Sequence, residues 1–183
     1  MKIIAQKIFT ANVSRTNFVF VKLYTDDGIE GVGEATLEWK TLTIVAALEE
    51  LERVLIGRNP FEVDAIIEQL HRDSYWRTGA VFRTALGAIE AALLDIKGKA
   101  LGVPVFELLG GKYRDRVKCY ANHWFAGAQT PDDYAQNARH AVEAMGYRAL
   151  KWDPFENASL EMDRAVFNRS IEANIRVGNE SAG

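Results

Sequence analysis

The hydrophobic pattern of this chain changes once, at Gly110-Gly111, and this change restricts the fold more than any other feature. Three strand-like segments and then three helical patterns come before the two glycines. Beyond them, strand and helix patterns alternate. Strands followed by consecutive helices are typical of an α+β domain, whereas alternating strands and helices indicate a parallel sheet. The sequence therefore predicts two domains, residues 1–111 and residues 112–183.

The first domain is predicted to open with a three-stranded antiparallel meander, because Asp26-Asp27-Gly28 supplies a turn between strand-like segments. The strands are expected at residues 3–10, 17–25 and 29–33. Apolar residues at helical spacing then predict helices over residues 42–55, 61–71 and 81–100. The last of these helices is rich in Ala and Gly, which would let a neighbouring helix approach closely.

The second domain is predicted to hold the first two β/α units of a parallel, TIM-like barrel. Strands are expected at residues 117–121 and 147–151, each followed by a helix. Thr130-Pro131-Asp132-Asp133 is typical of a helix start, with Thr130 as the N-cap and the acids near the positive end of the helix dipole. A complete barrel has eight strands and takes about 250 residues, so an incomplete barrel is expected here.

Composition and charge favour a soluble globular protein. Apolar residues make up 48% of the chain and the net charge is −3, so no basic excess indicates a nucleic-acid partner. No apolar run is long enough for a membrane span or a signal peptide, so no membrane partner is expected. Cys119 is the only cysteine, which favours a cytoplasmic protein. Its thiol lies in a strand pattern and is expected to be buried and inert.

Four blocks of the sequence, taken together and in order, resemble the enolase superfamily. GVGEA at residues 31–35 is similar to the third strand of its mandelate racemase and muconate lactonizing branch. AALLDIKGKALGVP at 91–104, followed by LLGG at 108–111, resembles the capping-domain signature of that branch. YAN at 120–122 and MGYRALKWDPF at 145–155 look most like the gluconate- and galactonate-type sugar acid dehydratases.

The resemblance extends from residue 1 to about residue 167, and it implies an N-terminal α+β capping domain over a modified TIM barrel. It also implies removal of a proton α to a carboxylate, followed by loss of water, with Mg²⁺ held by three carboxylates on later barrel strands. A carbon acid beside a carboxylate is very weak, so fixed positive charge must neutralise the intermediate. Those later strands are not expected in this chain, so no metal-binding residue is assigned. We predict that the 183-residue fragment is inactive and binds no Mg²⁺.

Lys151 and Asp153 are the predicted catalytic residues. Two residues apart on a strand, their side chains point the same way. The resemblance implies that Lys151 places positive charge near the substrate carboxylate, and that Asp153 orients Lys151 or hydrogen-bonds the sugar acid. Asp153 occupies a position where racemases have a second lysine, which disfavours the alternative of a racemase or cycloisomerase. For the fragment alone, a surface Lys–Asp pair before a proline turn remains the simpler interpretation.

The predicted substrate-binding residues lie on three loops and are Arg15, Trp39, Lys40, Asn122, His123 and Trp124. The resemblance implies that the first two loops close over the substrate. A cationic side chain could hold a carboxylate, an indole could exclude water, and the last three residues could contact a polyol. Each could instead be an ordinary exposed loop residue. The two remaining histidines, His71 and His140, lie on helical patterns and are expected to be solvated or capping.

A different class of function is a non-catalytic module that oligomerises or binds a partner. The strands expected at 117–121 and 147–151 would leave unpaired edges and apolar faces that a complete barrel covers. Burial of these edges by another copy of the chain predicts a homo-oligomer.

Overall fold

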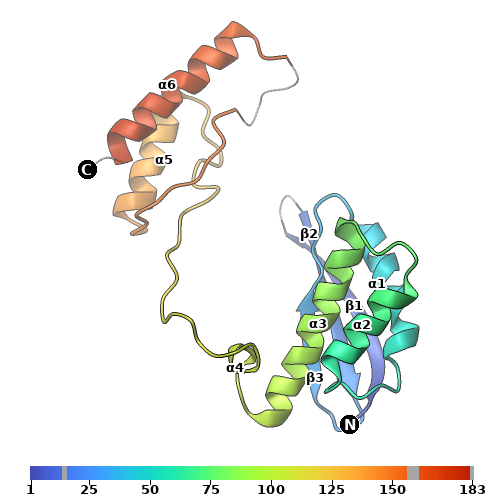
Figure 1. Ribbon diagram of the computed structural model, residues 1–183. Coiled ribbons are helices and arrows are strands. Elements are labelled where there is room, and N and C mark those ends of the chain that lie inside the picture. The colour runs from blue at the N-terminus through green and yellow to red at the C-terminus, as the bar shows by residue number, and fades with distance from the viewer. Residues whose placement is uncertain (14–15, 156–160, 182–183) are drawn as a thin grey trace. The chain divides into compact units, whose positions relative to one another are not determined.

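The computed structural model describes residues 1–13, 16–155 and 161–181, and the chain divides into two compact units, Met1–Tyr113 and Arg114–Gly183 (Figure 1). The first unit has a sheet covered by helices, and the second is built around a pair of helices.

An antiparallel sheet with strand order β1-β2-β3 opens the first unit, which confirms the predicted meander. The strands are β1 (Ile3–Val13), β2 (Thr16–Thr25) and β3 (Glu30–Glu34). Val19, Val21 and Leu23 alternate along β2 and are fully buried, because every second side chain of a strand points to the same face. The sheet therefore has one face in the core, and the intervening side chains form the opposite face.

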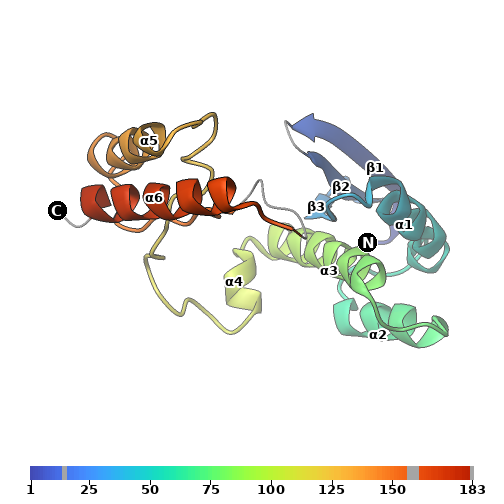
Figure 2. The same ribbon diagram turned by 90° about the horizontal axis from the view of Figure 1, so that it is seen from above.

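Helices of the first unit lie to one side of this sheet (Figure 2). They are α1 (Thr41–Leu55), α2 (Val63–Asp73), α3 (Ala80–Leu101) and the short α4 (Val105–Leu108). Apolar side chains from α1 and α3 meet the buried face of the sheet and have no exposed surface: Ile44, Leu48, Ile89, Leu93 and Ile96. The helical periodicity of the sequence thus identified the helices and part of their buried stripes, but Leu42, the first residue of the apolar pattern in α1, is 84% exposed, and Ile44, outside that pattern, is buried instead.

Strand β3 lies directly against the small residues of α3. A Cβ atom added to Gly33 would lie 1.8 Å from the carbonyl oxygen of Ala88, and one added to Gly31 would lie 2.1 Å from that of Ala92. Only glycine permits such an approach. The partner of this α3 surface is therefore a strand, where a helix was expected from the sequence.

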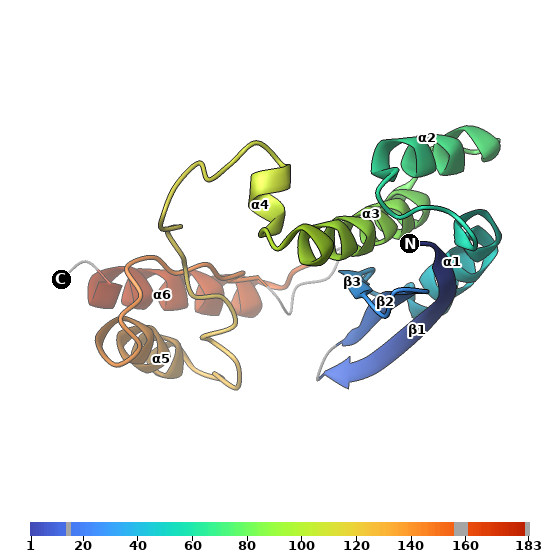
Figure 3. The same cartoon turned by 90° about the horizontal axis from the view of Figure 1, so that it is seen from below.

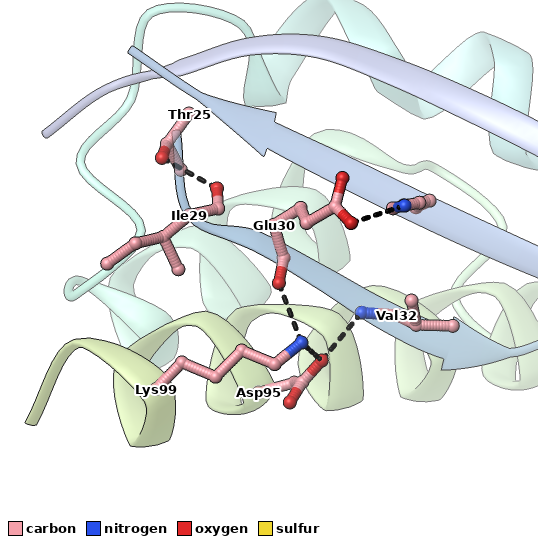
Figure 4. A network of polar contacts seen from close by, with 7 residues as sticks. Thr25, Ile29, Glu30, Val32, Asp95 and Lys99 are labelled. Carbon is pink, nitrogen blue, oxygen red and sulfur yellow. Dashed lines mark hydrogen bonds and ion pairs between the residues drawn. The ribbon is translucent and has the colours of Figure 1, made fainter. Parts of the chain in front are cut away.

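Polar contacts also join β3 to α3 (Figure 4). The Asp95 carboxylate accepts hydrogen bonds from the Val32 amide at 3.0 Å and from Lys99 Nζ at 2.7 Å. Lys99 Nζ also donates to the Glu30 carbonyl at 2.8 Å. The Glu30 carboxylate lies 2.5 Å from Lys22 Nζ, and this hydrogen bond raises the pKa of Lys22. These contacts hold β3 against both α3 and β2. Strand β3 leads into the loop that carries Trp39.

The second unit packs α5 (Pro131–Glu143) against α6 (Arg164–Ser181). The segments predicted as strands meet at a parallel bridge between Ala121 and Leu150. The Ala121 amide donates to the Ala149 carbonyl at 2.9 Å, and the Lys151 amide donates to the Ala121 carbonyl at 2.8 Å. The parallel direction agrees with the predicted β/α units. Within the part of the chain that the structure describes, pairing here is limited to this bridge, since two isolated strands are marginally stable.

Helix α5 begins with the N-cap that the sequence predicted. The Asp133 carboxylate accepts hydrogen bonds from the amides of Gln129 and Thr130, at 3.0 and 2.9 Å. The Thr130 hydroxyl oxygen in turn accepts from the Asp133 amide at 3.2 Å, which completes a capping box. The two backbone hydrogen bonds, that of Gln129 first, lower the pKa of Asp133.

We expect acid to weaken the second unit through Asp133. Its pKa is lower in the folded chain than in the unfolded chain, so the ionised carboxylate stabilises the fold above the unfolded value. That contribution is lost as the pH falls through the lowered pKa. Asp133→Asn cannot follow this titration, so its deficit in unfolding free energy should shrink below a pH of about 4. Denaturant unfolding at stepped pH measures the deficit, with Glu143→Gln at the other end of α5 as the control. A deficit independent of pH would contradict the prediction.

Candidate functional site

The candidate residues of the second unit come together where the two bridged segments end. Asn122, His123 and Trp124 follow Ala121, while Lys151 and Asp153 follow Leu150. Because the segments are parallel, their carboxyl ends lie at the same edge, which is where β/α folds place their chemistry. The Trp124 indole Nε1 donates to the Lys151 carbonyl at 3.0 Å and holds the two segments together.

An aromatic cluster supports this edge. The Trp152 ring centroid lies 5.5 Å from that of Trp124, 6.4 Å from that of Phe125 and 5.2 Å from that of Tyr134. The cluster thereby joins both segments to helix α5. Sequence reasoning singled out Trp124 but missed the other three rings. The strand pattern contained the clue for Trp152, since it stands between Lys151 and Asp153 and therefore points to the opposite side.

Lys151 and Asp153 have different surroundings. Lys151 is exposed, and its Nζ atom lies 6.0 Å from the centroid of the Tyr120 ring. One oxygen of the Asp153 carboxylate accepts the Phe155 amide at 3.0 Å and so stabilises the turn at Pro154. Lys151 thus presents a positive charge at the edge, whereas Asp153 has a local structural role. Contact of either side chain with a sugar acid remains a prediction.

Backbone conformation marks two of the predicted substrate-binding residues. Among the non-glycine residues that the structure describes, Trp39 (φ 62°) and His123 (φ 56°) have positive φ angles. This conformation costs about 1–3 kcal/mol and is concentrated at functional sites. Trp39 is also 83% exposed, so the strained backbone holds its indole ring in a position open to solvent. The strain was not predictable from the sequence.

The predicted loops of the first unit meet at the start of α1. The Asn17 side chain amide donates to Thr41 Oγ1 at 3.4 Å, and the Asn17 side chain oxygen accepts from Asn12 at 2.8 Å. Lys40 is the residue before α1, immediately after Trp39. Arg15 lies outside the described residues. The structure thus brings the ends of the first loop beside the loop that carries Trp39 and Lys40.

The other candidate ligands have ordinary surroundings, with one correction. Cys119 is exposed, not buried as expected, because strand pairing of its segment is limited, among the residues that the structure describes, to the bridge at Ala121. His71 Nε2 lies 3.3 Å from Arg83, and its ring stacks on Phe82. In residues 1–13, 16–155 and 161–181, no group of three or more His, Cys, Asp or Glu side chains could hold a metal ion. No helix within those residues has the length and hydropathy to cross a membrane.

A three-stranded meander with its helices, followed by the beginning of a β/α barrel, defines the N-terminal part of an enolase superfamily protein. The model of the mandelate racemase/muconate lactonizing enzyme N-terminal domain matches residues 3–110. The chain belongs to this family.

Similar proteins agree with this assignment. The chain is 42% identical to D-gluconate dehydratase from Thermoproteus tenax over 156 residues. This aligned segment is 85% of this chain and 31% of the relative. It is 40% identical to D-galactonate dehydratase from Variovorax paradoxus over 150 residues, which are 81% of this chain and 38% of that relative. A crystal structure of an enolase superfamily member from Salmonella Typhimurium superposes with a TM-score of 0.88 at 30% identity, covering 100% of this chain and 52% of that chain. The chain thus spans about a third of the length of these curated relatives.

Proposed function

We propose that the whole protein is a sugar acid dehydratase that removes a proton α to the substrate carboxylate and then eliminates water. The observation that supports this most is the identity of 40% or more with two sugar acid dehydratases over more than four fifths of the chain. The geometry is consistent with the proposal, because candidate polar residues gather at the carboxyl ends of two parallel segments.

One structure similar to this chain, of a putative L-alanine-DL-glutamate epimerase from Burkholderia xenovorans, was determined with bound magnesium and fumarate. The residues described here do not supply a Mg²⁺ site, so no step through a metal is assigned to them. The role proposed for the described residues is to bind the substrate. Within the second unit, Lys151 attracts the substrate carboxylate, and Asn122 and His123 contact its hydroxyl groups.

We propose that the 183-residue chain alone has no dehydratase activity. The test is an assay of the purified chain with Mg²⁺ and a panel of sugar acids that includes gluconate and galactonate. Formation of the 2-keto-3-deoxy product is followed over time. Sustained turnover by the chain alone would refute this proposal, and the T. tenax relative serves as the positive control.

A hybrid enzyme tests the role of Lys151 directly. Residues 1–155 of this chain replace the equivalent part of the T. tenax dehydratase. We expect the hybrid to dehydrate a sugar acid, and Lys151→Met to raise its KM about tenfold through loss of one charge pair. Lys118→Met removes an exposed lysine from the neighbouring segment and is the matched control. Equal effects of the two substitutions would exclude a substrate contact for Lys151.

A self-associating, non-catalytic module is the second candidate function. A groove of about 850 Å³ is lined by Tyr147, Arg148 and Leu150 and also by Val177 of α6. The backbone edge at this groove can accept a further strand. Strand pairing between copies would make the chain a homo-oligomer, whereas a monomer at high concentration in sedimentation experiments would count against this function.

A further inference from the structure

One face of the β1-β2-β3 sheet points away from the helices (Figure 3), and its centre is apolar. We call it the outer face. Phe18 and Phe20 stack along β2 with centroids 6.3 Å apart. Phe9 and Val13 of β1 are 47% and 51% exposed. The strand pairs place Phe9 beside Phe20 and Ala11 beside Phe18, so these side chains form one continuous surface.

Charges of opposite sign flank this apolar centre. The positive side chains of the outer face lie on the first two strands: Lys7 on β1 and Lys22 on β2. The negative side chains lie on the third: Glu30 and Glu34 of β3. Lys7 and Lys22 both approach the Tyr24 ring, with Nζ atoms 5.4 and 5.2 Å from its centroid. Lys22 and Glu30 pair with each other across β2 and β3, so the asymmetry of charge rests on Lys7 at the β1 edge and Glu34 at the β3 edge.

This arrangement is self-complementary. Consider two copies whose outer faces meet, related by a two-fold axis that runs parallel to β2 between the two sheets. In this arrangement β1 of one copy lies opposite β3 of the other, and the two β2 strands lie opposite each other. Such a rotation preserves the level of each residue along the strands. Lys7 lies on the level of Val32, and Glu34 lies one same-face position further along β3. Each Lys7 is then within reach of Glu34 of the other copy across sheets packed about 10 Å apart.

We propose that the outer face is an interface between two copies of this chain, related by a two-fold axis along β2. The stacked phenylalanines form its apolar centre, and Lys7 and Glu34 pair twice across it. Charged residues around an apolar centre are the usual anatomy of a protein interface. This interface is independent of the proposed reaction and distinct from the backbone edge of the second unit.

Charge reversal gives a test that a simple loss of stability cannot imitate. Lys7→Glu and Glu34→Lys each replace two attractive contacts by two repulsive ones, so each should raise the dimer dissociation constant at least about tenfold. A mixed dimer of the two variants restores both attractive contacts. In one contact the two introduced side chains face each other with opposite charges, and in the other the unchanged Glu34 of the first variant faces the unchanged Lys7 of the second. Sedimentation velocity should therefore show dimers in the mixture at concentrations where each variant alone is a monomer.

The controls separate this interface from other contacts. Glu49 of α1 and Lys118 of the second unit are exposed and lie outside the outer face. Glu49→Lys and Lys118→Glu change the charge by the same amount and should leave the dimer intact. Phe9→Ser should weaken the dimer without any change of charge. The proposal is overturned if the wild-type chain is monomeric throughout, if Lys118→Glu alone abolishes a dimer that Lys7→Glu leaves intact, or if the mixture of variants stays monomeric.

Discussion

Gly33→Ala is expected to destabilise the first unit by about 3 kcal/mol or more. The new Cβ would lie 1.8 Å from the Ala88 carbonyl oxygen, a backbone atom in the middle of a packed helix. No rotamer change can relieve this clash, so β3 must move away from α3. Such a movement also weakens the hydrogen bond from the Val32 amide to Asp95.

The same helix offers a matched control. Gly87 belongs to α3 and is exposed, and a Cβ atom there meets nothing within 4 Å. Gly87→Ala should stabilise the first unit by about 1 kcal/mol, because alanine favours the helical backbone. Urea unfolding followed by circular dichroism compares the two variants with the wild type. A Gly33→Ala variant as stable as the wild type would show that β3 does not lie against α3 as described.

Trp152→Ala is expected to destabilise the second unit by about 3 kcal/mol. The substitution removes the ring that lies against Trp124, Phe125 and Tyr134, and with it the apolar connection between the candidate site and α5. It should also free the carboxyl end of the 147–151 segment. Amide hydrogen exchange at the Ala121 and Lys151 amides, both in the parallel bridge, should accelerate.

Trp39→Ala is the corresponding control, because that indole is 83% exposed. It should change the free energy of unfolding by less than about 0.5 kcal/mol. Unfolding of the wild type and both variants in urea gives the comparison. A loss from Trp152→Ala as small as that expected from Trp39→Ala would mean that the aromatic cluster does not stabilise the second unit.

Local features of the chain were predictable because the residues that cause them are neighbours in sequence. Thr130 and Asp133 form their capping box within four residues, and Asp26-Asp27-Gly28 makes the turn between β2 and β3. Contacts between distant residues were less predictable. Cys119 was expected to be buried in a strand but is exposed, because burial of a strand residue depends on whether distant segments pack against it.

The same distinction holds for the candidate site. The motif around Lys151 indicated which residues to consider, and a parallel bridge between the two segments puts Asn122, His123 and Lys151 at one edge. The Asp153 carboxylate stabilises a local turn, and Trp39 and His123 have a strained backbone. Both features depend on how side chains and loops pack, so they cannot be predicted from the hydrophobic periodicity of the sequence.

The sequence by itself determined the family, the meander and the helices, because hydrophobic period, turn residues and caps act over a few residues. Only the tertiary structure decided that glycines of β3 lie on the backbone of α3, that aromatic rings join the site to α5, and that Lys7 and Glu34 stand at opposite edges of the outer face. These features depend on which distant segments face one another, and the free energy of that choice is shared among many contacts at once.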